Sequence, residues 1–128
     1  MKSLFCLIFL KSFLIVLFLV SIFLTISGHT EESAEVAKGK ELFQLKGCVA
    51  CHKIGGGKLT GPDLKGVTER REEEWLKKWI KSPDTMVFTD PIAKELLAEY
   101  MVPMPNQGLT DQEVIEVITY LKYEDSKK

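Results

Sequence analysis

Cys48-Val49-Ala50-Cys51-His52 is the stretch that decides the fold of this 128-residue chain. Two cysteines separated by two residues and followed at once by a histidine are typical of the covalent attachment of a c-type haem. Thiols at positions i and i+3 lie on the same face of a helical turn. Both can therefore form thioethers to one porphyrin, and His52 can place its imidazole beneath the iron as an axial ligand.

Other chemistry uses part of the same pattern. A pair of cysteines at this spacing can be a redox dithiol or one half of a zinc site. A zinc site needs a second pair of soft ligands, but the third cysteine of the chain, Cys6, lies at the extreme N-terminus. A thioredoxin-like dithiol needs a βαβ context, and the chain has no such pattern. We therefore predict one haem c with its iron, bound covalently through Cys48 and Cys51.

Residues 1–28 predict an export signal. Lys2 precedes an apolar stretch that runs from Leu4 to Ser27 and is interrupted only by Lys11, and a polar exit follows it. The stretch is about 25 residues long, enough to span a bilayer if Lys11 snorkels. Cleavage of residues 1–28 as a signal peptide and retention of 4–27 as a membrane anchor both stay open. Either way, the flanking charges place the domain in the periplasm or on the outer face of the bacterial cytoplasmic membrane.

The rest of the chain suffices for one domain. We expect an acidic linker over 29–33, the domain over 34–124 and a polar tail over 125–128. Without Lys2 and Lys11, the basic residues fall from 17 to 15 against 18 acidic ones, which leaves a net charge of −3. This balance gives no basic patch for nucleic acid and favours redox partners with positive docking faces.

Helical periodicity surrounds the cysteine motif. The pattern predicts an amphipathic helix over Ala34–Lys46, in which Gly39 permits close approach of another helix and Phe43 fills the contact. Thr68 is expected to cap a second helix over 69–81, which Ser82-Pro83-Asp84 ends. Asp90-Pro91 begins a third helix.

The last helix carries the clearest signals. Thr110 and Glu113 form a capping box, and Leu109 with Val114 fits a hydrophobic staple. Its expected buried face consists of Val114, Ile115, Val117, Ile118 and Leu121, with Tyr120 beside it.

Taken together, these features resemble a class I, monohaem cytochrome c over about residues 34–123. The resemblance rests on the Gly39/Phe43 helix, the cysteine motif, the loop Gly61-Pro62-Asp63-Leu64, a proline-flanked methionine and the C-terminal amphipathic helix. It implies an all-α cytochrome c fold of four to five short helices around one covalent haem. It also implies that the N-terminal and C-terminal helices cross, with Gly39 and Phe43 against Val117, Tyr120 and Leu121.

The resemblance also implies roles for single residues. In that family, the carbonyl of the proline after the loop glycine accepts the Nδ1–H of the ligand histidine, which implies that Pro62 orients His52. The family's distal methionine precedes a proline, which implies Met104 as the second axial ligand. The residues themselves agree, because two flanking prolines rigidify the loop. Met101 continues the phase of the preceding helix and stays the alternative.

Two tryptophans lie on one apolar stripe of the 69–81 helix. The ordinary role of such a stripe is core packing. Family members often donate an indole N–H to a haem propionate, and from the resemblance we prefer Trp79 over Trp75 for that role.

We expect an exported, monomeric electron carrier between respiratory redox partners, and not an enzyme. The chain has no second histidine placed as a distal base and no nucleophile constellation. Two alternatives stay open. One is a haem enzyme or gas sensor with an open sixth position, which would bind CO readily. The other is a subunit held permanently in a larger respiratory complex by an uncleaved N-terminal segment.

Overall fold

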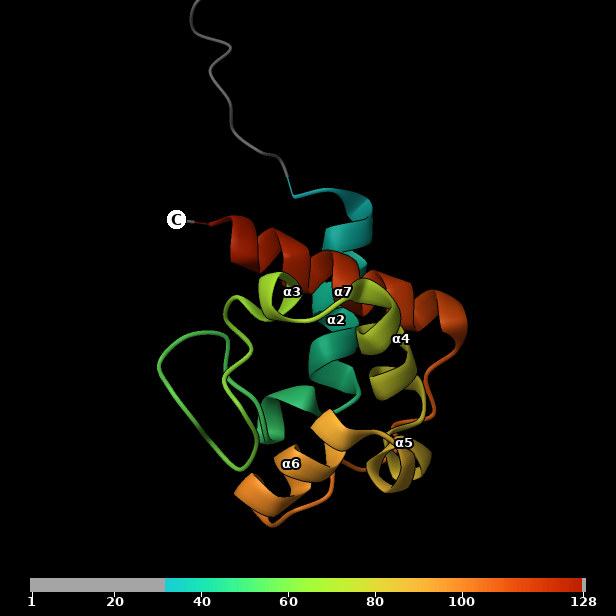
Figure 1. The fold of residues 1–128 in the computed structure, drawn as a ribbon. Coiled ribbons are helices and arrows are strands. Elements are labelled where there is room, and N and C mark those ends of the chain that lie inside the picture. Colours follow the sequence, from blue (N-terminus) through green and yellow to red (C-terminus); the bar gives the residue numbers. More distant parts are fainter. Residues whose placement is uncertain (1–31, 128) are drawn as a thin grey trace, which may run out of the picture. The chain divides into compact units, whose positions relative to one another are not determined.

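The computed structural model describes residues 32–127, and its regular structure is entirely helical (Figure 1). The elements are α2 (Ala34–Leu45), the 3₁₀ helix η1 (Cys48–Ala50), α3 (Val67–Arg70), α4 (Glu73–Lys81), α5 (Pro83–Thr89), α6 (Pro91–Tyr100) and α7 (Asp111–Ser126). The predicted all-α class is confirmed. The segment 1–28, with its predicted signal or anchor, lies outside the described residues. None of the helices within 32–127 combines the length and apolar character needed to cross a membrane.

Helices α2 and α7 cross in close contact, as expected (Figure 1). Gly39 is buried in α2 and lies against the backbone of Glu116 in α7. One turn further along α2, the ring of Phe43 lies 5.6 Å from the ring of Tyr120, at an interplanar angle of 58°. Such a tilted arrangement is favourable for aromatic pairs. The predicted contact between the first and last helices of the domain is confirmed.

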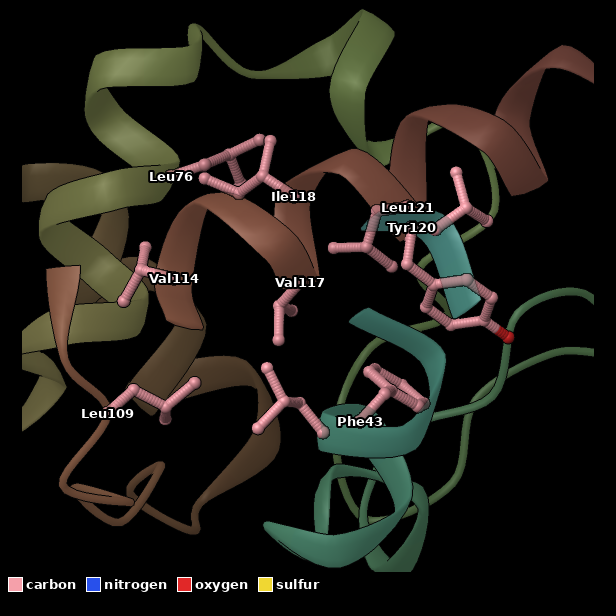
Figure 2. Packing of buried hydrophobic residues seen from close by; sticks show 10 residues of the cluster. Phe43, Leu76, Leu109, Val114, Val117, Ile118, Tyr120 and Leu121 are labelled. Atoms are coloured by element: carbon pink, nitrogen blue, oxygen red, sulfur yellow. The ribbon is translucent and has the colours of Figure 1, made fainter. Parts of the chain in front are cut away.

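The core forms along one face of α7. Its buried side chains meet Phe43 of α2, Leu76 of α4 and Leu109 at the entry to α7 (Figure 2). The α7 members are Val114, Val117, Ile118, Tyr120 and Leu121. The expectation that Ile115 belongs to this face was wrong, because its side chain is 44% exposed. Glu116 is buried instead, and Lys38 Nζ lies 2.9 Å from its Oε1, which compensates the buried charge.

The helix expected over 69–81 is two helices. The α3 helix follows Gly66, and the chain then becomes extended at Arg71, with φ −133° and ψ 138°. Asp125 near the end of α7 accounts for the early start. Its carboxylate accepts hydrogen bonds from the Gly66 N–H (2.5 Å), the Thr68 N–H (3.0 Å) and the Thr68 hydroxyl (2.7 Å). Thr68 is therefore not the helix cap, and Asp125 belongs to the folded domain rather than to a free polar tail.

Helices α5 and α6 complete the fold beside the methionine segment, residues 101–108. Pro83 ends the pattern of α4, as expected, but it is also the first residue of α5, a helix that the sequence did not predict. Asp90 caps α6 as predicted, accepting a hydrogen bond from the Ala93 N–H at 2.9 Å. The α6 helix ends at Tyr100, and its C-cap residue Met101 has a left-handed backbone with φ +59°.

Candidate functional site

The cysteine motif borders a cavity of about 520 Å³. Its walls come from α2, η1, the 54–66 loop, α3, α4, α6, α7 and the methionine segment, and they are mainly apolar. A smaller cavity of about 80 Å³ adjoins it and shares Cys48, His52 and Met104. Volumes of roughly 300–1,000 Å³ are typical of sites for small molecules and cofactors.

Both thiols lie on one tight turn. Cys48 begins η1 and Cys51 follows it directly, and both side chains are half-buried and free of disulfides. The Cys48 carbonyl accepts hydrogen bonds from the N–H groups of Cys51 (3.2 Å) and His52 (2.9 Å). Burial raises the pKa of the Cys48 thiol. The turn therefore presents two thiols and one imidazole to the same space.

The orientation of His52 is fixed from the opposite loop. Its Nδ1 lies 2.9 Å from the Pro62 carbonyl oxygen, which can only accept, so Nδ1 carries the proton. The lone pair is thereby left on Nε2, as metal ligation requires. Gly61 packs flat against the ring, since a Cβ atom there would come within 2.6 Å of His52 Cε1. The contact that the resemblance implied for Pro62 is present.

The two candidate methionines occupy different places. Met104 lines both cavities together with His52. Met101 lines neither of these, and its side chain is 79% exposed. Met101 is thus a helix cap on the surface, whereas Met104 shares the enclosed space with the imidazole.

Trp75 and Trp79 both line the larger cavity, with ring centroids 5.6 Å apart and planes 19° from parallel. The Trp75 Nε1–H is buried and has no hydrogen-bond partner among the described residues. The Asp90 carboxyl is a neighbour of this indole. The Ala93 N–H lowers the pKa of that carboxyl, and the Trp75 indole lowers it further. No hydrogen bond joins the Trp75 and Asp90 side chains. The sequence pattern places both tryptophans on one stripe and does not show which of them donates to a propionate. The unpartnered N–H makes Trp75 a candidate donor beside Trp79.

The side chains around the cavity fit a covalently attached porphyrin. Two thiols, an imidazole with a free Nε2 and a thioether sulfur border one apolar space. The guanidinium groups of Arg70 and Arg71 and the buried Trp75 donor also border it. Cations and an unsatisfied N–H suit the acidic substituents that a haem carries.

Comparison with known proteins agrees with this chemistry. A family model described as Cytochrome c matches residues 36–124. The C subunit of nitric oxide reductase from Stutzerimonas stutzeri is 28% identical over 123 residues, and the match covers 83% of this chain and 77% of that protein. Cytochrome c oxidase subunit 2 of Alkalihalophilus pseudofirmus is 30% identical over 71 residues, which cover 47% of this chain but 21% of that protein.

Solved structures share the fold. A cytochrome c from Rhodothermus marinus has a TM-score of 0.72 and 27% identity, covering 79% of this chain and 85% of its own. The cytochrome c domain of a Pseudomonas putida protein is 38% identical with a TM-score of 0.62, covering 70% of this chain and 89% of its own.

Proposed function

Since the chain belongs to the cytochrome c family and binds haem c through Cys48 and Cys51, we propose that it carries single electrons between respiratory partners with His52 and Met104 as axial ligands. The observation that carries the proposal is the placement of the His52 imidazole and the Met104 side chain on the same pair of cavities. Bound haem c supplies an iron that takes up and releases one electron, and a His/Met pair raises its potential relative to bis-histidine ligation.

The chain's own residues would hold this centre rigid. Cys48 and Cys51 fix the group covalently. Pro62 keeps the proton on Nδ1 of His52, which leaves the Nε2 lone pair available to bind the iron. Pro103 and Pro105 restrict the backbone on both sides of Met104 and hold a weak ligand in place. With both axial positions filled, the coordination would change little as the electron arrives and leaves.

We further propose that the domain works outside the cytoplasm. The export pattern of residues 1–28 supports this, and so does the resemblance, since c-type haem is attached outside the bacterial cytoplasm. One comparison bears on the partner of the domain. The match to the nitric oxide reductase protein covers 83% of the chain. Residues 32–127 are 96 of the 128 residues, or 75% of the chain, which is less than the 83% that the match covers. The match therefore also takes in part of the segment before residue 32. A subunit held permanently in a larger respiratory complex by an uncleaved N-terminal segment is therefore a second candidate beside a free shuttle.

Absorption spectra with CO test the axial ligands. We expect the intact holoprotein to be low-spin in both redox states and not to bind CO. Met104→Ala should become high-spin and bind CO when reduced, because the sixth position opens. Met101→Ala is the matched control, since that side chain is exposed and lies outside the cavity. If the intact protein binds CO, or if Met101→Ala rather than Met104→Ala opens the site, the proposed ligation is wrong.

A different measurement decides between a free shuttle and a subunit held by its N-terminal segment. Mass spectrometry of the native N-terminus separates cleavage near residue 28 from retention. A retained segment with the protein in the membrane fraction, co-purifying with an oxidoreductase, supports the anchored form. A cleaved, freely extracted protein supports the shuttle.

A further inference from the structure

The loop over 54–66 depends on one carboxylate. Gly55, Gly56 and Gly57 have φ values of +83°, +95° and +93°, so this part of the loop has no regular secondary structure of its own. Asp63 provides acceptors for it. Its Oδ1 accepts the N–H of Gly55 (2.7 Å) and of Lys65 (2.8 Å), and its Oδ2 accepts the N–H of Gly57 (2.7 Å). These three donors hold the pKa of the Asp63 carboxyl below its ordinary value.

The same segment carries the acceptor for His52. Pro62 directly precedes Asp63, and its carbonyl oxygen lies 2.9 Å from His52 Nδ1. On either side, the Gly61 N–H donates to the Cys51 carbonyl and the Leu64 N–H to the Lys53 carbonyl, both at 2.8 Å. The stretch 61–64 is thus clamped to 51–53, and the Asp63 side chain closes the intervening loop over it.

We propose that Asp63 is a positioning residue for His52: by binding the Gly55–Lys65 loop through both carboxylate oxygens, it holds the Pro62 carbonyl against the imidazole. The inference rests on the proposed role of His52 as an iron ligand. A hydrogen bond at Nδ1 raises the basicity of the ligand nitrogen and stabilises the oxidised iron. Weakening that bond should therefore raise the reduction potential.

Asp63→Asn is the variant to make. An amide keeps the size of the side chain, but its NH₂ group cannot accept, so at least one of the three loop N–H groups loses its partner. Glu99→Gln is the control. It also replaces a carboxylate by an amide, it lies next to the cavity residue Tyr100, and it breaks only the exposed ion pair with Lys58 of the same loop. The control therefore matches the lost charge without removing the loop's acceptors.

The readout is the exchange of the His52 Nδ1 proton with water, measured by NMR on the reduced holoprotein. We expect exchange about tenfold faster in Asp63→Asn, because the loss of a charge-assisted hydrogen bond makes local opening of the loop easier. Glu99→Gln should exchange like the wild type. The reduction potential should rise more in Asp63→Asn than in Glu99→Gln. Equal potentials with unchanged exchange would mean that Asp63 acts only by its charge, and would overturn the proposal.

A measurement on the unmodified holoprotein serves if Asp63→Asn does not fold. The Gly55 and Gly57 amide protons should be protected and should exchange with the same opening free energy as the His52 Nδ1 proton. Glycine amides that exchange freely beside a protected Nδ1 proton would overturn the proposal. Neither readout involves Met104, so failure here is distinguishable from failure of the His/Met ligation, which the CO spectra report.

Discussion

Gly39 of α2 lies directly against Glu116 of α7: a Cβ atom on Gly39 would come within 2.0 Å of the Glu116 carbonyl oxygen. It would also come within 2.9 Å of the Tyr120 Cβ. The nearest obstacle is helix backbone, which cannot turn aside as a long side chain can. The first and last helices of the domain can cross this closely because residue 39 has no side chain.

Gly39→Ala should therefore destabilise the holoprotein. Replacing a glycine inside a helix by alanine ordinarily gains about 0.5–1 kcal/mol. Here we expect the free energy of unfolding to fall by about 3 kcal/mol, because overpacking forces the helices apart. Denaturant unfolding measures the change. Gly47→Ala is the comparison variant. Its φ of +77° is strained for alanine but nothing lies within 4 Å, so its loss of stability reports backbone strain without a steric clash. A Gly39→Ala protein as stable as the wild type would contradict the close contact.

A second prediction concerns the hydrogen bonds that join Asp125 of α7 to the start of α3. Asp125→Ala removes the acceptors of the Gly66 N–H, the Thr68 N–H and the Thr68 hydroxyl. We expect a loss of about 2 kcal/mol in the free energy of unfolding, because these part-buried donors are left without partners. Asp84→Ala, which removes one exposed hydrogen bond from Asn106, should cost much less. Equal unfolding midpoints for the two variants would show that the Asp125 hydrogen bonds do not stabilise the packing of α3 on α7.

The Asp125 hydrogen bonds also show which features of the fold the sequence does not predict. The cysteine motif, the crossing glycine, the Asp90 cap and the Thr110 capping box are local signals, and the structure confirms their geometry. The break at Arg71 is not local. The pattern from 69 to 81 continues through it, and the break accompanies a carboxylate more than fifty residues away that binds the start of α3.

Helix α5 was missed for another reason. Pro83 ends one helix and begins the next, and a proline signals either event equally well. The apolar residues Met86, Val87 and Phe88 of α5 are also consecutive, so they show no helical periodicity, and Phe88 is 74% exposed in the structure. At the site, the sequence offered Met101 and Met104 as alternatives, and only tertiary placement shows which of them shares a cavity with His52. The loop-binding role of Asp63 depends likewise on turns that composition does not reveal.

The pH dependence of stability should include Glu73. Hydrogen bonds from Lys122 (2.5 Å) and Lys77 (3.0 Å) lower the pKa of Glu73 from 4.5 to about 2. A lowered pKa means that the ionised form stabilises the folded state. The contribution is therefore complete above pH 4.5 and is lost as the pH falls toward 2.

Glu73→Gln tests this contribution. The variant should unfold at lower denaturant than the wild type at pH 7, and the difference should shrink between pH 4.5 and pH 2. Added salt should also reduce it, because the groups are exposed. Glu74→Gln is the control, since Glu74 pairs with Lys77 inside α4 and does not reach α7. A difference that persists unchanged at pH 2 would exclude the ion pair as its source.

The last prediction concerns the buried Trp75 N–H. A buried donor without an acceptor is costly, so its removal should be neutral or stabilising if no acceptor arrives with the bound haem. We expect the opposite. Trp75→Phe should lower the stability of the holoprotein by about 1–2 kcal/mol, because we expect a haem propionate to accept this N–H.

Two further variants complete that experiment. Trp79→Phe measures the role implied for Trp79 on the same scale, and the larger loss identifies the stronger propionate donor. Asp90→Ser keeps a cap for the Ala93 N–H while removing the neighbouring carboxylate. If Trp75→Phe loses its effect in the Asp90→Ser background, Asp90 is the acceptor and the propionate assignment fails. If the effect persists, Asp90 is not the acceptor.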